Sequence, residues 1–285
     1  MTVVKHLPND RPRRAIVERD SMAPSNHLFM ERGEERYGDR LYSHENPAEA
    51  DRLGAMAQVF DPYSFERLRP LVRPGSRTCD VGAGLGTVAQ WLMSSSGAET
   101  VVIDTDVRNL GGRGFKEIQA DITDPAFDPG RFDLVHARFV LMHLREREAV
   151  LRRMATWVRP GGWLVLSDSW ELGAPTSPCA AYRETAAKAS ELATRTTGSD
   201  FNAGRRYPRP MAELGFSEIG FAVDVPVIEG GGALARFWVS TANAARPALV
   251  RELGPETVDD ALAYLADPET RDIGIAMVTM WGRRP

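Results

Sequence analysis

Short apolar runs and amphipathic stretches alternate along the chain. The apolar runs lie at residues 78–81, 101–104, 131–138 and 159–168; the first ends beside a glycine-rich segment, and the second and last end in an aspartate. The stretches between them carry apolar residues three and four positions apart, as a helix with one buried face does. Strands that alternate with helices predict an α/β protein with a doubly wound, mostly parallel sheet.

Helix and turn signals give the expected boundaries within this plan. Pro47 opens a helix that is expected to end at Asp61-Pro62, and a second helix is expected over residues 63–71. A further helix is expected to begin near Phe139. Pro160-Gly161-Gly162 predicts a turn that stops this helix and starts the fifth strand.

The C-terminal half predicts extra helices and a closing strand pair. Helical patterns at residues 182–193, 234–251 and 258–265 interrupt the α/β alternation, and Asp267-Pro268 ends the last one. The final strands are expected at about 214–223 and 275–284. We therefore expect an N-terminal arm and helical lid at 1–70 and a core at 71–285, with a helical insertion at about 171–210 and further helices at about 233–266.

Composition narrows the class of protein. The chain has 285 residues, 43% of them hydrophobic and 26% charged, with a net charge of −4. A negative balance disfavours general nucleic-acid binding, which needs a basic surface. No apolar run approaches the roughly 20 residues of a membrane-spanning helix, and the N-terminus lacks the apolar core of a signal peptide, so we expect a cytoplasmic protein. Cys79 and Cys179 stand alone, and no metal site is predicted.

The most informative motif follows the first predicted strand. Asp80 precedes a turn with glycines at 82, 84 and 86, and Thr87 stands where a dinucleotide-binding motif would have its third glycine. An anion at Asp80 would also repel a pyrophosphate, so a dinucleotide-dependent oxidoreductase is disfavoured and a cationic ligand is favoured.

These residues resemble the class I S-adenosylmethionine-dependent methyltransferases, whose motif is acidic-x-Gly-x-Gly-x-Gly. The resemblance extends over roughly residues 70–170. It implies a Rossmann-like sheet of seven strands, the last antiparallel, and S-adenosylmethionine as cofactor, with S-adenosylhomocysteine as product. It also implies that Asp80 orders water or the cofactor's amino group, and that Gly82, Gly84 and Gly86 let the backbone lie against its methionine part.

The resemblance assigns further cofactor contacts at the ends of later strands. Asp104 would bind both ribose hydroxyls, and Thr105 would lie beside the adenine. Asp121 would accept the adenine amine, and Ile122 would pack on the ring. Arg138, at the end of the fourth strand, could contact the cofactor carboxylate or pair with an acid.

Two residues are candidates for the catalytic base. His143 follows the fourth strand and has a suitable pKa range for taking a proton from a hydroxyl; the alternative is a histidine that packs against the sheet with its nitrogens satisfied. Asp168, at the end of the fifth strand, could face the acceptor pocket or cap the following loop. His136 lies within a strand and is expected to be structural. His27, His44, Tyr37 and Tyr42, in the N-terminal arm, could line the acceptor pocket.

The sequence predicts methyl transfer to a small organic acceptor, most directly O-methylation of a natural-product hydroxyl. Nitrogen or carbon acceptors stay open, as does a non-methylating catalyst of cyclisation or rearrangement, because fold and cofactor do not fix the reaction. A protein-modifying methyltransferase is a further alternative. The expected partner is the small-molecule acceptor, and a homodimer is possible.

Overall fold

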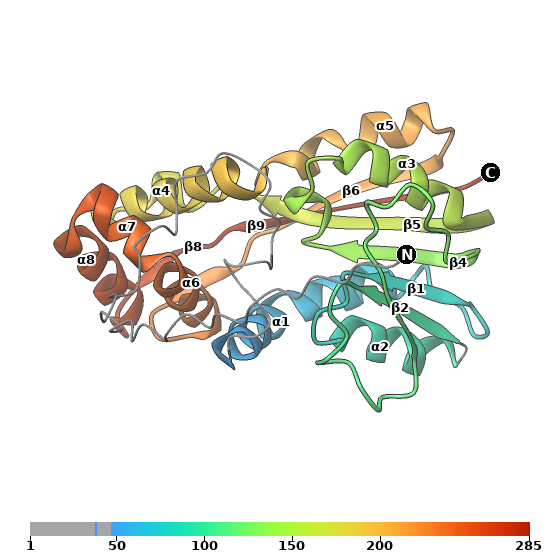
Figure 1. Ribbon diagram of the computed structural model, residues 1–285, viewed down its shortest axis with the longest axis horizontal. Helices are drawn as coiled ribbons and strands as arrows, with labels where there is room; N and C mark the ends of the chain where they lie inside the picture. The colour runs from blue at the N-terminus through green and yellow to red at the C-terminus, as the bar shows by residue number, and fades with distance from the viewer. Residues whose placement is uncertain (1–37, 39–46, 98) are drawn as a thin grey trace, which may run out of the picture. The chain divides into compact units, whose positions relative to one another are not determined.

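Seven strands form the main sheet of the computed structural model, which describes residues 38, 47–97 and 99–285. The strands are β1 (Thr78–Val81), β2 (Thr100–Asp104), β3 (Lys116–Gln119), β4 (Phe132–Arg138), β5 (Val158–Trp170), β6 (Ser217–Asp224) and β9 (Ala276–Arg283). Their order across the sheet is β3-β2-β1-β4-β5-β9-β6 (Figure 1). Strands β1 to β5 pair in parallel, and β9 is antiparallel to both of its neighbours. The predicted fold class, a doubly wound, mostly parallel seven-stranded sheet, is confirmed.

Helices surround this sheet and extend beyond it. They are α1 (Pro47–Leu68), α2 (Thr87–Ser96), α3 (Arg147–Trp157), α4 (Ala180–Thr197), α5 (Pro208–Glu213), α6 (Ala233–Ala244), α7 (Arg246–Leu253) and α8 (Pro255–Ala266), with 3-10 turns η1 (Leu141–His143), η2 (Ala174–Thr176) and η3 (Ala203–Arg206). A small second sheet pairs β7 (Val227–Glu229) with β8 (Arg271–Ile273). Figure 1 shows α4, α6, α7 and α8 gathered beyond the carboxyl end of β4.

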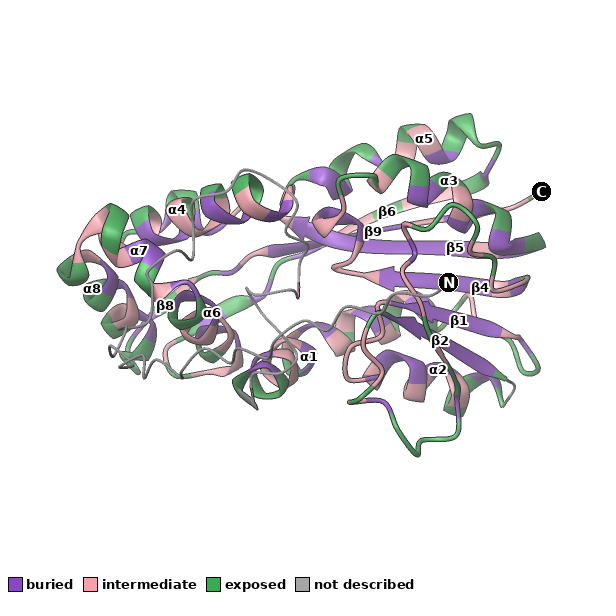
Figure 2. Cartoon of the chain, in the orientation of Figure 1, coloured by how far each residue is buried: buried purple, intermediate pink, exposed green. Residues whose placement is uncertain are grey.

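The central strands are buried, as a parallel sheet covered on both faces requires. Every residue of β1 and β2 is buried, and so are most residues of β4 and β5 (Figure 2). The largest fully buried side chains include Trp157 of α3 and Phe132 of β4. This rigid centre holds the carboxyl ends of β1, β2 and β4 in fixed positions, which are the ends where ligands bind in such sheets.

Helix α1 corrects the expected break at Pro62. Instead of two helices, one helix continues through Pro62 to Leu68. A proline removes one backbone hydrogen bond from a helix, but the burial of apolar residues on both sides offsets this loss. Phe60 is 1% exposed and Leu68 is fully buried, and the helix contacts both α2 and α6.

The expected helix from Phe139 is also wrong. Phe139 has a φ of +54°, which no helix accommodates, and only the 3-10 turn η1 follows before α3 begins at Arg147. The Phe139 N–H donates to the Ser167 carbonyl at 2.7 Å, and the Met142 N–H donates to the Asp168 carboxylate at 3.1 Å. These contacts with β5 fix a short loop where the sequence pattern predicts a helix.

The other expected helices and strands lie within a few residues of their predicted positions. The fifth strand begins at Val158, and its glycine turn is an irregularity within the strand, where Gly161 has a φ of +78°. The helical pattern over 234–251 divides into α6 and α7, because Pro247 in the first turn of α7 cannot continue α6. The N-terminal arm, with His27, Tyr37, Tyr42 and His44, lies outside the described residues.

Candidate active site

A cavity of about 660 Å³ opens at the carboxyl ends of the parallel strands. This volume is within the range of about 300–1,000 Å³ that small-molecule sites occupy. Residues of α1, α4 and α6 line it together with the strand ends. Of the predicted site residues, the cavity brings together Asp80, Gly82, Gly84, Asp104, Thr105, Asp121, Ile122, Arg138 and His143. Gly86 and Asp168 are not among its lining residues.

The three motif glycines have different physical reasons for being glycine. All three have positive φ values, +64° at Gly82, +55° at Gly84 and +69° at Gly86. A Cβ on Gly82 would lie 2.3 Å from Val140, and one on Gly86 would lie 2.9 Å from Leu110. A Cβ on Gly84 would meet no described protein atom closer than 3.9 Å, so this glycine keeps the cavity open.

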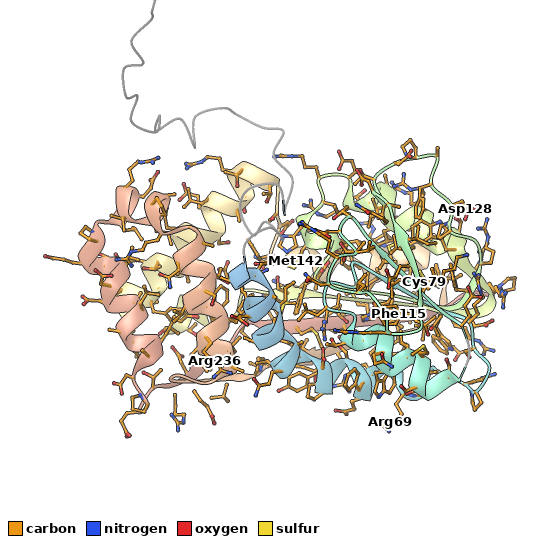
Figure 3. The ribbon with its side chains drawn as sticks, turned by 60° about the horizontal axis from the view of Figure 1, so that its bottom comes forward. Arg69, Cys79, Phe115, Asp128, Met142 and Arg236 are labelled. Carbon is orange, nitrogen blue, oxygen red and sulfur yellow. The ribbon has the colours of Figure 1, made fainter. Side chains whose placement is uncertain are left out.

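Gly86 belongs to the packing between α2 and the loop before β3. Its Cβ position would also lie 3.0 Å from the ring of Phe115, which Figure 3 labels near α2. Phe115 is 7% exposed and packs in a cluster with Ala89 of α2 and Val102 of β2. The structure therefore gives Gly86 a role in closing the turn onto the core.

Asp104, at the end of β2, connects that strand to the glycine turn. Its carboxylate accepts the Gly84 N–H at 2.9 Å and the Asp106 N–H at 3.1 Å, and it is 8% exposed. The Thr105 hydroxyl donates to it at 3.4 Å. These contacts hold the carboxylate at the cavity wall, in a position to accept further donors from a ligand.

Asp121 and Ile122 follow the end of β3. The Asp121 carboxylate accepts both the N–H and the hydroxyl of Thr123, at 2.8 and 2.7 Å. Ile122 is 7% exposed and packs in the main core cluster. The loop is thus held in shape by its own side chain, with a carboxylate and an apolar surface side by side on the cavity wall.

Asp80 and His136 form a buried pair at adjacent strand ends. They are register partners on β1 and β4, and His136 Nδ1 lies 2.7 Å from the Asp80 carboxylate. His136 is 1% exposed, and its Nε2 has no hydrogen-bond partner among the described residues. When Asp80 accepts the Nδ1–H of a neutral imidazole, Nε2 presents a lone pair. Both residues line the cavity.

The unpartnered His136 Nε2 bears on whether the predicted cofactor fits this site. A buried polar atom without a partner is unfavourable, so His136 Nε2 calls for a donor from a ligand. The ammonium group of S-adenosylmethionine is such a donor, and the acidic Asp80 beside it suits its charge. The residues present fit the cofactor. The sequence alone does not show the pairing of His136 with Asp80, because the register between β1 and β4 is not visible in the chain.

Arg138 connects the end of β4 to α1. Its guanidinium donates to Asp61 at 2.7 Å and to the Ser64 hydroxyl at 3.0 Å. Asp61 also accepts the Thr87 hydroxyl at 3.2 Å. Of the two alternatives for Arg138, the structure realises pairing with an acid, while the side chain also lines the cavity. Helix α1 is thereby held against the cofactor motif.

His143 lies on η1 and reaches a chain of hydroxyl groups from α4. Its Nδ1 is 2.9 Å from the Ser199 hydroxyl, which is 2.7 Å from the Thr197 hydroxyl. Thr197 donates its only proton to the Ala193 carbonyl at 2.8 Å, so Ser199 must donate to Thr197 and accept from Nδ1. This order places the proton of the neutral ring on Nδ1 and leaves the lone pair on Nε2.

Burial keeps this imidazole neutral. Burial, together with the positive charges of Arg52 and Arg147, lowers the pKa of His143 to about 3. The ring is therefore uncharged near neutral pH, in a form that can accept a proton.

Asp168 is 2% exposed and does not line the cavity. Its carboxylate accepts the Tyr207 hydroxyl at 2.6 Å and the Met142 N–H at 3.1 Å. Burial raises the pKa of Asp168 to about 7, against the opposing effect of these hydrogen bonds. Its contacts hold the loop that carries His143 instead of capping the loop that follows β5, and its place outside the cavity lining disfavours a role as the base.

Sequence reasoning missed a buried ion pair on α1. Arg52 donates to Glu49 through Nε and Nη2, at 2.7 and 2.6 Å, and both side chains are at most 5% exposed and line the cavity. The guanidinium carbon Cζ of Arg52 also lies 5.2 Å from the ring centre of Phe237 on α6. The Glu-x-x-Arg spacing on a helix was the available signal.

In the part of the chain that the structure describes, no group of three or more His, Cys, Asp or Glu side chains could hold a metal ion. None of the described helices combines the length and the apolar character needed to cross a membrane.

Comparison with known proteins identifies the family. A family model described as a methyltransferase domain matches residues 55–217, more than half of the chain. The chain therefore belongs to this methyltransferase family. This family and the fold confirm the methyltransferase class that the sequence resembles.

Individual relatives are distant. Phosphoethanolamine N-methyltransferase 1 of Zea mays is 23% identical over 158 residues, which cover 52% of this chain and 29% of that enzyme. Methyltransferase str3 of Strobilurus tenacellus is 32% identical over 127 residues, covering 42% of this chain and 46% of str3. The chain thus spans less than a third of the length of the plant enzyme and about half of the fungal one.

Solved structures share the fold. Phosphoethanolamine N-methyltransferase 2 of Haemonchus contortus, in complex with phosphomonomethylethanolamine and S-adenosylhomocysteine, has a TM-score of 0.51 and 14% identity, covering 84% of this chain and 58% of that one. The YcgJ protein of Bacillus subtilis has a TM-score of 0.51 and 13% identity, covering 79% and 99%. Identities this low concern the fold alone.

Proposed function

We propose that this protein transfers a methyl group from S-adenosylmethionine to a hydroxyl oxygen of a small, largely apolar acceptor. The observation that carries the proposal is the protonation state of His143 and its place in the cavity lining. A neutral imidazole, with its proton fixed on Nδ1 and its lone pair on Nε2, lines the same cavity as the cofactor motif. A hydroxyl loses its proton when it is methylated, and Nε2 can take it.

The bound cofactor supplies an electrophilic methyl group on a cationic sulfur. His143 Nε2 receives the proton that the acceptor hydroxyl gives up as its oxygen gains the methyl group. The sulfur loses its positive charge in the same event, so protonation of the imidazole leaves the charge inside the cavity unchanged. The low pKa of His143 therefore favours a neutral base before transfer without preventing it from accepting the proton.

The cofactor contacts follow the predicted roles with one addition. Asp104 would bind the ribose hydroxyls, Thr105 would lie beside the adenine, and Asp121 with Ile122 would hold its amine and its ring. Arg138 would contact the cofactor carboxylate from its place beside Asp61. The addition is His136, whose Nε2 would accept a hydrogen bond from the cofactor's ammonium group beside Asp80. Helix α1 and the helices that follow β5 would form the lid, which excludes water from the reaction.

The acceptor end of the cavity supports an apolar substrate. The side chains that α1, α4 and α6 contribute there are mainly aliphatic or aromatic, including Met56, Phe60, Ala186, Ala193 and Phe237. Such a wall favours an organic molecule with a sizeable hydrocarbon part over a fully charged one. The cytoplasmic location and the homodimer stay predictions from the sequence.

The test is a labelling experiment. The protein is incubated with methyl-labelled S-adenosylmethionine and a fractionated extract of its source organism. We expect label in a small molecule, with the methyl carbon in an ether by NMR, and S-adenosylhomocysteine in equal amount. A His143→Ala variant should lose most of the turnover and keep its affinity for S-adenosylhomocysteine.

Other outcomes would contradict specific parts of the proposal. A labelled N-methyl or C-methyl group would refute oxygen as the acceptor atom. Label in the macromolecular fraction alone would refute a small-molecule acceptor. Unchanged turnover in His143→Ala would refute this residue as the base.

A further inference from the structure

Helix α6 carries two buried polar atoms without a partner among the described residues, and both belong to residues that line the cavity. The indole Nε1 of Trp238 and the hydroxyl Oγ1 of Thr241 are both buried, and neither has a hydrogen-bond partner among the described residues. Both residues line the cavity, and Thr241 is 7% exposed. Their spacing of three residues places them on the same face of α6.

These atoms lie outside the cofactor motif. The predicted cofactor contacts come from the ends of β1 to β4, whereas Trp238 and Thr241 belong to a helix that packs against α1, α4 and α8. A threonine hydroxyl in a helix often bonds to the carbonyl four residues earlier, but Thr241 does not. Two buried polar groups on one face therefore keep their hydrogen-bonding capacity for a molecule inside the cavity.

Helix α4 and the end of β5 contribute a mainly apolar part of the cavity wall. Helix α4 contacts α6 and contributes Ala186, Ala189 and Ala193 to the same cavity. Glu171, just after β5, lines it as well and accepts the Ser190 hydroxyl at 3.4 Å. The space between α4 and α6 thus suits a mainly hydrocarbon group, with polar atoms only at fixed points.

We propose that Trp238 and Thr241 form the subsite that recognises the acceptor molecule, and that they bind an oxygen that accepts hydrogen bonds, such as a ketone or ester carbonyl, on an otherwise apolar body. The indole N–H is a donor only, so its partner must be an acceptor atom. The Thr241 hydroxyl can donate to the same oxygen. This inference rests on the proposed function for the identity of the occupant.

The first test uses a matched pair of probes on the S-adenosylhomocysteine-loaded protein. 4-Hydroxybenzophenone and 4-benzylphenol share two rings and a phenol and differ by a carbonyl in place of a methylene group. We expect the ketone to bind about tenfold more tightly, the scale of one buried hydrogen bond. In Trp238→Phe this preference should disappear, because the ring stays and the N–H is lost. Thr241→Val should reduce it.

A spectroscopic signature reports on the N–H itself. In a ¹H–¹⁵N spectrum the six tryptophans give separate indole signals, and the Trp238 signal is the one missing in Trp238→Phe. We expect this signal to move on addition of the ketone and not with 4-benzylphenol. Trp91→Phe is the matched control, since Trp91 stacks on Phe65 away from the cavity lining.

The outcomes separate this subsite from the proposed function. Equal affinities of the two probes in the unmodified protein, failure of both to bind, or a ketone preference that persists in both variants would each overturn the subsite. Ketone binding through Trp238 with a methyl label that later appears on nitrogen or carbon would refute O-methylation and leave the subsite in place. Unchanged affinity for S-adenosylhomocysteine in the variants shows that they are folded.

Discussion

Replacement of His136 by asparagine distinguishes the roles of the two imidazole nitrogen atoms. The asparagine amide can donate to Asp80 as Nδ1–H does, but no acceptor remains at the position of Nε2. If Nε2 binds the cofactor's ammonium, the variant loses one hydrogen bond to a charged group. Such a bond contributes about 1.5–3 kcal/mol, which corresponds to a roughly 10- to 150-fold loss of affinity.

The assay compares two ligands by isothermal titration calorimetry. S-Adenosylhomocysteine carries the ammonium group, and 5′-methylthioadenosine keeps the adenine, ribose and thioether but lacks the amino-acid part. His136→Asn should lower the affinity for S-adenosylhomocysteine by the factor above and leave the affinity for 5′-methylthioadenosine unchanged. Asp104→Asn is the matched control, because both ligands have the ribose, and it should weaken both.

Two results would refute this reasoning. Equal weakening of both ligands by His136→Asn would mean that the substitution disturbs the glycine turn in general. Unchanged affinity for both would mean that Nε2 does not face the ammonium group. Neither result would alter the assignment of the family, which rests on the fold and on the matched residues.

Further predictions concern the cofactor site and its supports. Asp104→Ala should weaken S-adenosylhomocysteine by about 1–3 kcal/mol through lost hydrogen bonds, and unchanged binding in calorimetry would refute the ribose contact. Gly84→Ala should lower Tm less than Gly86→Ala, because a Cβ on Gly86 would also meet Leu110 at 2.9 Å. Gly84→Ala should nevertheless lower the affinity for S-adenosylhomocysteine more than Gly86→Ala does. The reverse order in either measurement would contradict the different roles of the two glycines. Because burial raises the pKa of Asp168 to about 7, the folded state binds its proton more tightly than the unfolded state, and this residue's contribution to stability should fall as pH rises from about 4 to 7. Asp168→Asn should remove that dependence in denaturant titrations, and an identical pH profile would refute the assignment.

Much of the fold was predictable from local signals. The glycine turn after Asp80 and the acidic end of the next strand fixed the first crossover. The patterns at residues 182–193 and 258–265 located α4 and α8 to within a few residues. These signals act within a few positions along the chain, so they need no knowledge of tertiary contacts.

The errors arise where a distant contact outweighs a local preference. Pro62 predicts a helix end, but the burial of Phe60 and Leu68 keeps α1 continuous. The apolar run after Phe139 reads as a helix, but hydrogen bonds to Ser167 and Asp168 on β5 hold it as a loop. Such contacts join residues about 26 to 28 positions apart, a distance that periodicity does not record.

The same limit applied to the site. The sequence located nine of the residues that line the cavity, because each lies at or shortly after the carboxyl end of a strand. It could not show that His136 pairs with Asp80, since that pairing depends on the register between β1 and β4. It also could not exclude Asp168 from the cavity wall, because the direction of a side chain at a strand end depends on what it bonds to, here Tyr207 from a segment 39 residues later.

The distribution of charge across the cavity explains how one site can serve two unlike ligands. Carboxylates of Asp80, Asp104 and Asp121 lie at the strand ends, where a cationic cofactor would be held. The space between α4 and α6 is mainly apolar, so an uncharged acceptor is favoured there. His143 carries no charge near neutral pH because of its burial, and it therefore does not repel the cofactor before transfer. If His143 is the base, it would take the acceptor's proton during methyl transfer, and its new charge would replace the positive charge that the cofactor loses.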